Sequence, residues 1–325
     1  MKFISLNQCP VFLDDFFMRS LDKLKGKDAL VIYNPPSTLI TSPVLLRSKK
    51  TLEEHIAYLR DNNIKKAIVV AENIQFLSQC PGLEYLWVLP GMDSVDFDYS
   101  PVYTMPNLKW LSCRTTAGLD DRQVASVDYS QFKGLRRLCV SGAQGHENVN
   151  LAGNVVSLIF DQGFPKAKDL KNYIPGKELR NFSICASPIT SLHGIEQAMK
   201  LRYLSLSYNR RLTDISSLSS LRDTLARIEI DACGRIESFS VLETLTNLEF
   251  LALKGSNTLP NLSFLKYMPK LKYLYLTMNV ADGDLSLCQS IPYVRIQNRK
   301  HYSHKNQDLP KQITDPDAVY SLEEM

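Results

Sequence analysis

The residues of this chain that could take part in catalysis or metal binding are few and widely spaced. The segment Ser141–Glu147 brings glycines, His146 and a carboxylate together, but the Lys-Ser or Lys-Thr pair of a phosphate-binding loop does not follow it. His301 and His304 stand three residues apart, and no third histidine or carboxylate follows them at a recognisable metal-ligand spacing. We therefore predict no catalytic residue, no metal site, no cofactor and no enzymatic activity.

The seven cysteines give no sign of a disulfide framework or of a reactive thiol. Their number is odd and no C-x-x-C pair occurs, which is typical of reduced cysteines in a cytoplasmic protein. Cys139 and Cys185 could lie on an exposed face of a sheet, but a catalytic thiol needs a neighbouring base. The sequence places neither His146 nor His193 beside them.

A chemistry of recognition is indicated by aromatic and charged residues that recur beside the leucines of a repeated phrase, L-x-x-L-x-L. Its clearest copies start at Leu201, Leu248 and Leu271. Eight of the 22 residues that flank the second apolar position are aromatic, whereas about two are expected from the 9% aromatic content. Tyr, Trp and Arg are also the residues that anchor protein interfaces. We predict a partner-binding surface formed by Tyr85, Trp87, Trp110, Arg137, Tyr203, Arg227, Glu229, Asp231, Phe250, Tyr273, Tyr275 and Tyr293.

Eleven copies of the phrase can be followed along the chain. Their starts lie 19 to 27 residues apart, and such units must stack, because one unit is too small to bury its own apolar face. Between Leu212 and Leu221 the apolar residues follow at every third place, a spacing that suits a short 3₁₀ return segment. The copies begin at Ile64, Leu83, Leu108, Leu135, Val155, Leu179, Leu201, Leu225, Leu248, Leu271 and Ile291.

The chain resembles the leucine-rich repeat family, and the short return segments bring it nearer the internalin-like class. The match covers residues 64–300. The family's Asn in the turn after the strand has its counterpart in Asn209 and Asn279, with Cys233 as an accepted substitute. The resemblance implies an α/β solenoid, a leucine-rich repeat horseshoe with a parallel concave β-sheet of about 11 strands and an N-terminal α/β cap.

The alternation within each copy predicts a strand and therefore the direction of its side chains. Successive side chains of a strand point to opposite faces, so the second and third leucines face the core and the residues beside them face the concave surface. Eleven strands about 4.8 Å apart make a surface roughly 50 Å long, which suits a folded protein or a long peptide. Cross-strand contacts, which stabilise sheets, are the alternative explanation of the aromatic side chains.

The two ends of the chain are expected to cover the ends of the repeat core. In residues 1–63 we predict a cap, with a strand over residues 29–33 and a helix that opens at the capping box Thr51-Leu52-Glu53-Glu54. Residues 64–300 hold the repeats. Residues 301–325 are polar and form a C-terminal cap or tail.

Composition argues against several kinds of partner. The net charge is only +4 over 325 residues and no basic stripe occurs, so we predict no nucleic-acid binding. No stretch approaches the roughly 20 apolar residues of a membrane span. The first residues also lack the long apolar segment of a signal peptide. We expect a cytoplasmic monomer that binds neither nucleic acid nor membrane.

These observations predict a non-enzymatic protein-protein interaction module that binds a protein partner on its concave face. An inhibitor or immunity-type protein, which occludes its partner, is one such role. Two alternatives stay open. The N-terminal segment could hold an enzyme or effector module with the repeats as its targeting arm, or the aromatic rows could bind a glycan by stacking on sugar rings.

Overall fold

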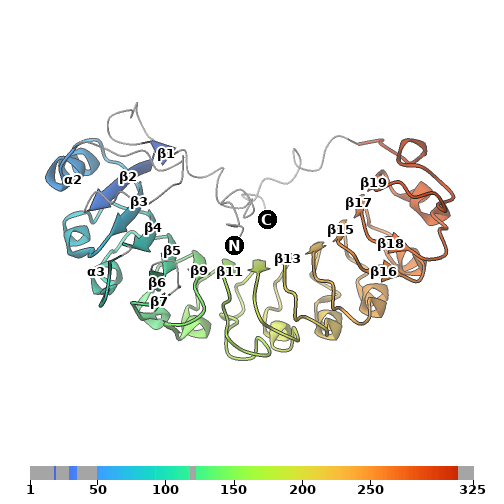
Figure 1. Cartoon of the computed structure of the whole chain (residues 1–325), viewed down its shortest axis with the longest axis horizontal. Helices are drawn as coiled ribbons and strands as arrows, with labels where there is room; N and C mark the ends of the chain where they lie inside the picture. The colour runs from blue at the N-terminus through green and yellow to red at the C-terminus, as the bar shows by residue number, and fades with distance from the viewer. Residues whose placement is uncertain (1–17, 20–28, 35–49, 92, 118–121, 314–325) are drawn as a thin grey trace. The chain divides into compact units, whose positions relative to one another are not determined.

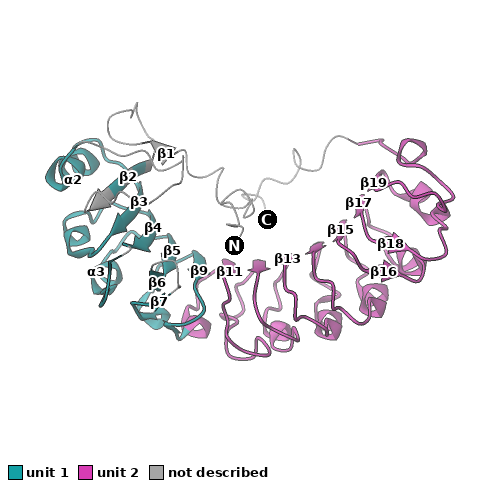
Figure 2. Ribbon diagram, in the orientation of Figure 1, with its two compact units in different colours: residues 1–148 teal, residues 149–325 magenta. Residues whose placement is uncertain are grey.

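The computed structural model describes residues 18–19, 29–34, 50–91, 93–117 and 122–313. They fall into two compact units, residues 1–148 (unit 1) and residues 149–325 (unit 2), and each is described by itself (Figure 2). Both units are built from strands that alternate along the chain with turns and short helical segments. None of the helices in the described part of the chain has the length and apolar character needed to span a bilayer.

Unit 1 contains a parallel sheet with the strand order β1-β2-β3-β4-β5-β9 (Figure 1). Four of these strands lie at predicted repeats, and their register places Tyr85 opposite both Lys66 and Trp110. The strand expected over residues 29–33 is β2. The strands of the sheet are β1 (Met18–Arg19), β2 (Ala29–Asn34), β3 (Lys66–Ala71), β4 (Tyr85–Pro90), β5 (Trp110–Arg114) and β9 (Arg137–Ser141).

Unit 2 contains a parallel sheet with the strand order β11-β12-β13-β14-β15-β17-β19 (Figure 1). Every strand begins two residues after a predicted repeat start, so all eleven expected strands are confirmed across the two units. Equivalent repeat positions stand opposite one another, as Arg227 does to both Tyr203 and Phe250. The strands are β11 (Ser157–Asp161), β12 (Asn181–Cys185), β13 (Tyr203–Ser207), β14 (Arg227–Asp231), β15 (Phe250–Lys254), β17 (Tyr273–Leu276) and β19 (Tyr293–Ile296).

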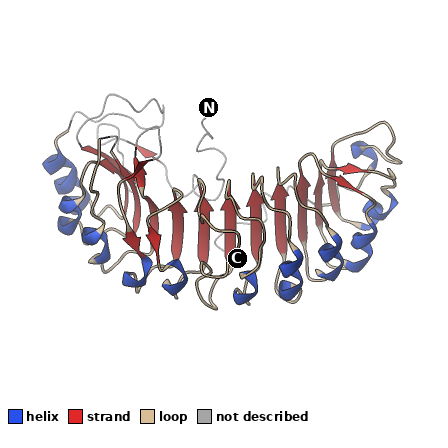
Figure 3. Ribbon diagram, turned by 60° about the horizontal axis from the view of Figure 1, so that its bottom comes forward, coloured by secondary structure: helices blue, strands red, loops and turns tan. Residues whose placement is uncertain are grey.

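Short helical segments return the chain from one strand to the next, and most are 3₁₀ turns as predicted (Figure 3). The apolar residues at every third place point inward, since Leu218 and Leu221 are both buried. In unit 1 the segments are η3 (Gln75–Gln79), α3 (Ser100–Tyr103) and η4 (Tyr129–Gln131). In unit 2 they are η5 (Val149–Leu151), η6 (Ile195–Gln197), η7 (Ser216–Leu221), η8 (Ser240–Thr244), η9 (Ser263–Tyr267), η10 (Ser286–Ser290) and η11 (Asn306–Asp308).

Within the described ranges, three pairs of two-residue strands join neighbouring turns outside the large sheets. The pair in which β6 meets β7 is antiparallel, and the other two pairs are parallel. In unit 1 the pairs are β6 (Thr116–Ala117) with β7 (Arg122–Gln123) and β8 (Val127–Asp128) with β10 (His146–Glu147). In unit 2 the pair is β16 (Thr258–Leu259) with β18 (Asn279–Val280).

The apolar residues of the repeated phrase form the core of each unit. In β14, Ile228 and Ile230 are buried, whereas Arg227, Glu229 and Asp231 are partly exposed. In β14 this alternation agrees with the predicted side-chain directions, whereas β5, β11 and β15 are each buried at four successive positions. Burying one such aliphatic side chain contributes about 1.5–3 kcal/mol to the stability of the fold, so the stacking of many equivalent side chains stabilises each unit.

The turn after the strand is held by a buried side chain, but at fewer places than expected. Asn209 is fully buried; its Oδ1 accepts a bond from the backbone N–H of Ser187 (2.9 Å) and its Nδ2 donates to the carbonyl of Ile184 (2.9 Å). The thiol of Cys233 lies 3.6 Å from the carbonyl of Leu206, so the predicted substitution is confirmed. At Asn279 the chain departs from the pattern. This residue begins the short strand β18, and its backbone N–H donates to the carbonyl of Asn257 (3.1 Å).

A helix follows the predicted capping box in unit 1. α2 (Leu52–Asp61) begins after Thr51, whose hydroxyl accepts a bond from the backbone N–H of Glu54 (3.2 Å) while the Glu54 carboxylate accepts from the N–H of Thr51 (2.8 Å). Its buried face consists of His55, Ile56 and Leu59. The remaining part of the predicted cap, other than residues 18–19 and 29–34, lies outside the described residues. The boundaries predicted at residues 63 and 300 stay a prediction.

The C-terminal segment turns back on the last strand of unit 2. The N–H of Val294 donates to the carbonyl of Pro310 (3.0 Å), and the N–H of Gln312 donates to the carbonyl of Pro292 (2.9 Å). Tyr293 and Lys311 are thereby antiparallel partners. Tyr302 is buried, and its hydroxyl accepts from the N–H of Val280 (3.0 Å). The rest of the predicted tail, residues 314–325, lies outside the described residues.

Candidate functional site

An aromatic cluster lies on three neighbouring strands of the unit 2 sheet, β15, β17 and β19, at positions predicted for the concave face. That face lies opposite the return segments (Figure 3). The cluster consists of Phe250, Tyr273, Tyr275 and Tyr293. Phe250 and Tyr275 are stacked with ring centroids 5.6 Å apart. The centroid of Tyr293 lies 5.9 Å from that of Tyr273 and 6.0 Å from that of Tyr275. Adjacent strands supply these rings, so the repeat register itself brings them together.

Four of the predicted partner-binding side chains are buried, which corrects the expectation that they are exposed. Trp110 is 2% exposed, Phe250 and Tyr273 are 3% exposed, and Tyr203 is 5% exposed. Their strand positions are those predicted for the concave face. Strands lie only about 4.8 Å apart, however, so large side chains on neighbouring strands cover one another. Cross-strand contacts are seen for three of them, Phe250, Tyr273 and Tyr203.

The other predicted side chains keep part of their surface open. Tyr275 and Tyr293 form the accessible rim of the aromatic cluster. Their buried neighbours hold the rings in place, so the rim presents apolar surface that is already ordered. The residues with intermediate exposure are Tyr85, Trp87, Arg137, Arg227, Glu229, Asp231, Tyr275 and Tyr293.

Beside the aromatic cluster, Arg227 is held by an internal ion pair. Its Nη2 lies 2.6 Å from Oε1 of Glu229, and its guanidinium stands over the ring of Phe250 at 4.0 Å and over that of Tyr203 at 5.2 Å. Lys254 Nζ lies 3.8 Å from Glu229 and 3.9 Å from Asp231. Arg227, Glu229 and Asp231 form a charged row along β14, and this row is largely neutralised by the pair Arg227–Glu229 and by Lys254.

Tyr203 completes this charged row as a neutral hydroxyl. Burial raises the pKa of Tyr203 well above its usual value, and the negative charge of Glu229 raises it further. The hydroxyl donates to Oε1 of Glu229 at 3.4 Å. Tyr203 therefore acts as a buried support for Glu229 and Arg227.

At the C-terminal edge of the cluster lie two cations and an apolar side chain that the list of predicted binding residues does not contain. Arg295 stands over the ring of Tyr275, with 5.8 Å from its guanidinium carbon to the centroid, and Lys311 Nζ lies 5.3 Å from the centroid of Tyr293. Ile313 packs against the cluster. The alternation of β19 already places Arg295 on the concave face, but nothing in the repeat pattern predicts the return of residues 309–313.

In unit 1 the predicted aromatic residues lie on two neighbouring strands. Tyr85 and Trp87 belong to β4, and Lys66 Nζ stands 4.9 Å from the centroid of the Tyr85 ring. Trp87 lies opposite Ser112 in the register, and Trp110 lies opposite Arg137. Trp87 thus keeps part of its ring accessible, as Tyr85 does.

His146, in the loop Ser141–Glu147, belongs to a partly buried hydrogen-bond network. The hydroxyl of Tyr129 lies 2.9 Å from Nδ1 of His146 and 2.7 Å from the thiol of Cys113, while His146 Nε2 lies 3.1 Å from the carbonyl of Ser141. These contacts fit a neutral ring that accepts at Nδ1 and donates from Nε2. Burial lowers the pKa of His146 to about 4, so the ring is neutral near pH 7.

The described cysteines are all buried, including Cys139 and Cys185, for which the sequence left an exposed position open. Burial raises the pKa of the Cys113 thiol to about 12, far from that of a nucleophile. His301 and His304 make separate local contacts, to the carbonyl of Val280 and to the hydroxyl of Ser303. Within the described ranges, no group of three or more metal-ligating side chains comes together.

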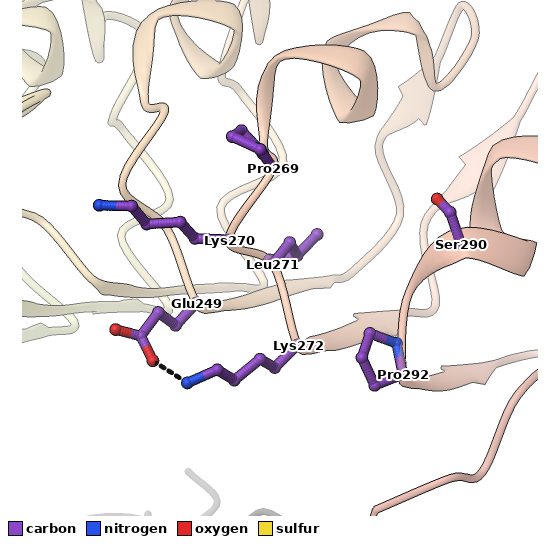
Figure 4. Close-up of a pocket in the computed structure, with 7 residues that line it drawn as sticks. All are labelled: Glu249, Pro269, Lys270, Leu271, Lys272, Ser290 and Pro292. Atoms are coloured by element: carbon purple, nitrogen blue, oxygen red, sulfur yellow. Dashed lines mark hydrogen bonds and ion pairs between the residues drawn. The ribbon is translucent and has the colours of Figure 1, made fainter.

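A shallow pocket in unit 2 contains none of the predicted binding residues (Figure 4). Lys272 in its lining pairs with Glu249 at 2.7 Å, and Lys270 donates to Oδ1 of Asn247 at 2.5 Å. Its polar groups therefore satisfy one another. The lining residues are Glu249, Pro269, Lys270, Leu271, Lys272, Ser290 and Pro292.

Comparison with known proteins finds similarity of structure but not of sequence. No protein-family model matches the sequence, and a search of curated proteins finds no relative. An internalin from Listeria monocytogenes is 18% identical, with a TM-score of 0.49, over 74% of this chain and 77% of that chain. Toll of Drosophila, in its complex with Spatzle, is 14% identical with a TM-score of 0.53 over 73% of this chain and 34% of that chain. Mouse RP105, in complex with MD-1, is 13% identical with a TM-score of 0.48 over 84% of this chain and 55% of that chain. At these identities the likeness is one of fold.

Proposed function

We propose that this chain, which has a leucine-rich repeat fold, is a non-enzymatic module that binds a protein partner on its concave face. The observation that carries the proposal is the ordered, partly exposed rim of the aromatic cluster, formed by Tyr275 and Tyr293. The fold supports it, since the Toll structure of similar fold is a complex with a protein, Spatzle. We further propose that the chain acts as a cytoplasmic monomer.

The rim is suited to binding because its side chains are already fixed. Tyr275 is stacked on the buried ring of Phe250, so little side-chain freedom is lost when a partner covers it. Tyrosine also offers a large apolar surface together with a hydroxyl that can bond to a partner. In unit 1, Trp87 offers the same kind of anchor. A partner that covers these rings would gain most of its affinity from a few contacts.

The charged row beside the cluster has a supporting role in this proposal. Arg227 is bonded to Glu229 and sandwiched between Tyr203 and Phe250, so it fixes the floor of the site. A role as an inhibitor or immunity-type protein would follow if the surface of the partner that this chain covers contained the partner's functional site. That role is a narrower proposal than protein binding itself.

The experiment that tests protein binding is affinity capture from a lysate of the source organism, with mass spectrometry to identify the captured protein. Tyr275→Ala and Trp87→Ala should each weaken capture by at least about 2 kcal/mol, roughly thirtyfold, because each removes an ordered aromatic anchor. Titration of the identified partner against each variant measures the change.

A matched control is available in the same unit. Tyr267 is an exposed tyrosine of η9, one of the return segments that lie opposite the concave face. Tyr267→Ala should leave capture unchanged. If Tyr275→Ala and Trp87→Ala bind the partner as the wild type does, or if Tyr267→Ala weakens binding equally, the concave face is not the binding site.

A further inference from the structure

The C-terminal part of unit 2 contains more basic residues than acidic residues that could pair with them. Residues 291–313 contain five lysines and arginines but a single acidic residue, Asp308. The Asp308 carboxylate accepts a bond from the backbone N–H of Lys305 (2.9 Å), so it is already engaged. The basic residues of this segment are Arg295, Arg299, Lys300, Lys305 and Lys311.

Arg295 differs from the other cations on these strands. Arg227 pairs with Glu229, and Lys272 pairs with Glu249. Arg295 is exposed on the concave face, and no carboxylate among the described residues lies within ion-pair distance of it. Its guanidinium is instead held near the ring of Tyr275.

Lys311 places a second cation beside Arg295. Its ammonium donates to the backbone carbonyls of Val294 and Asn306, so it is fixed in position without a carboxylate. Burial lowers the pKa of Lys311, and the positive charge of Arg295 lowers it further because like charges repel. An anionic group placed between them would relieve this repulsion.

The apolar surface next to these cations is the rim of the aromatic cluster. Tyr275 and Tyr293 form it, and Ile313 closes one side. The antiparallel pairing of residues 310–312 with β19 holds that side chain in place. Two cations without a carboxylate partner among the described residues, Arg295 and Lys311, therefore lie next to the ordered apolar surface of Tyr275 and Tyr293. The cations and the apolar surface belong to one face of unit 2.

We propose that the partner docks an acidic segment here, with its carboxylates on Arg295 and Lys311 and an apolar or aromatic side chain on Tyr275 and Tyr293. This inference rests on the proposed function and specifies the chemistry of the partner. The occupant is a segment of a separate protein, chosen by charge complementarity. Arg295, rather than the internally paired Arg227, is then the residue that selects the partner.

The test uses the full chain and short fluorescent peptides. One peptide is rich in glutamate and tyrosine, and its matched counterpart has glutamine in place of every glutamate. Fluorescence anisotropy should show at least about tenfold tighter binding of the acidic peptide, and the difference should shrink as salt is added. Equal affinities for the two peptides would overturn the inference.

Two charge-reversal variants locate the effect. Arg295→Glu should weaken binding of the acidic peptide at least about tenfold, whereas Lys266→Glu, which alters net charge equally at an exposed position of η9, should not. Arg295→Gln should fall between the wild type and Arg295→Glu. If Arg295→Glu and Lys266→Glu weaken binding of the acidic peptide equally, the selectivity comes from the overall charge of the protein, and the proposed site at Arg295 is contradicted.

The chain's own C-terminus provides the remaining comparison. Residues 314–325 contain four acidic residues and no lysine or arginine. If the acidic peptide binds only after these residues are deleted, the segment of this chain is the occupant and the proposal of a separate partner is overturned. If capture depends on Tyr275 but the two peptides bind equally, protein binding stands and only the acidic partner is excluded.

Discussion

Each unit contains a group of polar and aromatic side chains that sequence inspection singles out, but the two groups differ in their access to water. In unit 1, Tyr129 is fully buried and bonded to His146 and Cys113. In unit 2, Tyr275 is partly exposed beside Arg295. The first group satisfies its own hydrogen bonds and leaves nothing for a ligand, while the second keeps apolar surface and charge available. Residue types alone therefore do not identify a site, because burial decides which groups can act.

The largest difference between the two groups is expected in stability. Tyr129→Ala should lower the free energy of unfolding by about 3–5 kcal/mol, since it leaves a cavity and removes the partner of His146. Tyr275→Ala should cost no more than about 1.5 kcal/mol, because its ring is already partly in water. Urea unfolding followed by circular dichroism measures both. Similar losses for the two variants would contradict the distinction between a structural and an accessible cluster.

A second contrast is expected in the pH dependence of the unit 1 network. The pKa of His146 is lowered to about 4 in the folded chain, compared with an ordinary value of 6.5, so the unfolded state takes up a proton first as the pH falls. Its contribution to stability is fully present above pH 6.5 and is lost between pH 6.5 and 4. The ring is partly exposed, so we expect a loss of about 1–2 kcal/mol.

Urea unfolding of the wild type and of His146→Gln across this range tests the linkage. The glutamine variant is less stable at pH 7 but should lack the part of the pH slope due to this ring. Tyr275→Ala, which lies outside the network, should keep the full slope. An unchanged slope in His146→Gln would mean that other groups govern the acid sensitivity.

The smallest expected effects are changes in the free energy of unfolding when Arg227 or Arg295 of the unit 2 face is replaced. Arg227→Met should lower the free energy of unfolding by about 1 kcal/mol, because Glu229 loses its main partner and keeps only Lys254 and the Tyr203 hydroxyl. Arg295→Met should change it by less than about 0.5 kcal/mol, as expected for an exposed side chain. Binding of the acidic peptide should show the opposite order. A larger stability loss in Arg295→Met would assign it a structural role.

The repeat period predicts the strands well because it is a local property repeated many times. The spacing from Leu201 to Leu204 and Leu206 places one strand, and the next copies place its neighbours in register. The alternation of side chains along a strand follows from backbone geometry alone. For this reason the face on which Arg227 or Tyr275 lies could be predicted without any knowledge of long-range contacts.

Exposure could not be predicted in the same way. Phe250 lies at a position predicted for the concave face, yet it is buried beside Arg227, Tyr273 and Tyr275 from neighbouring strands, and Trp110 is buried as well. Such lateral contacts depend on the size and rotamer of each neighbour, which the period does not specify. The pairing of Lys311 with Tyr293 was missed for a related reason, since it joins two segments that share no repeat signal.

The pairing of residues 310–312 with β19 also has a consequence for assembly. A terminal strand with unbonded backbone groups is a template on which another molecule can add its own strand. Here the N–H of Val294 is already bonded to the carbonyl of Pro310, and the covering segment itself presents a proline and a lysine, two residues that discourage further strand addition. Addition of another strand at β19 would therefore first have to displace this segment.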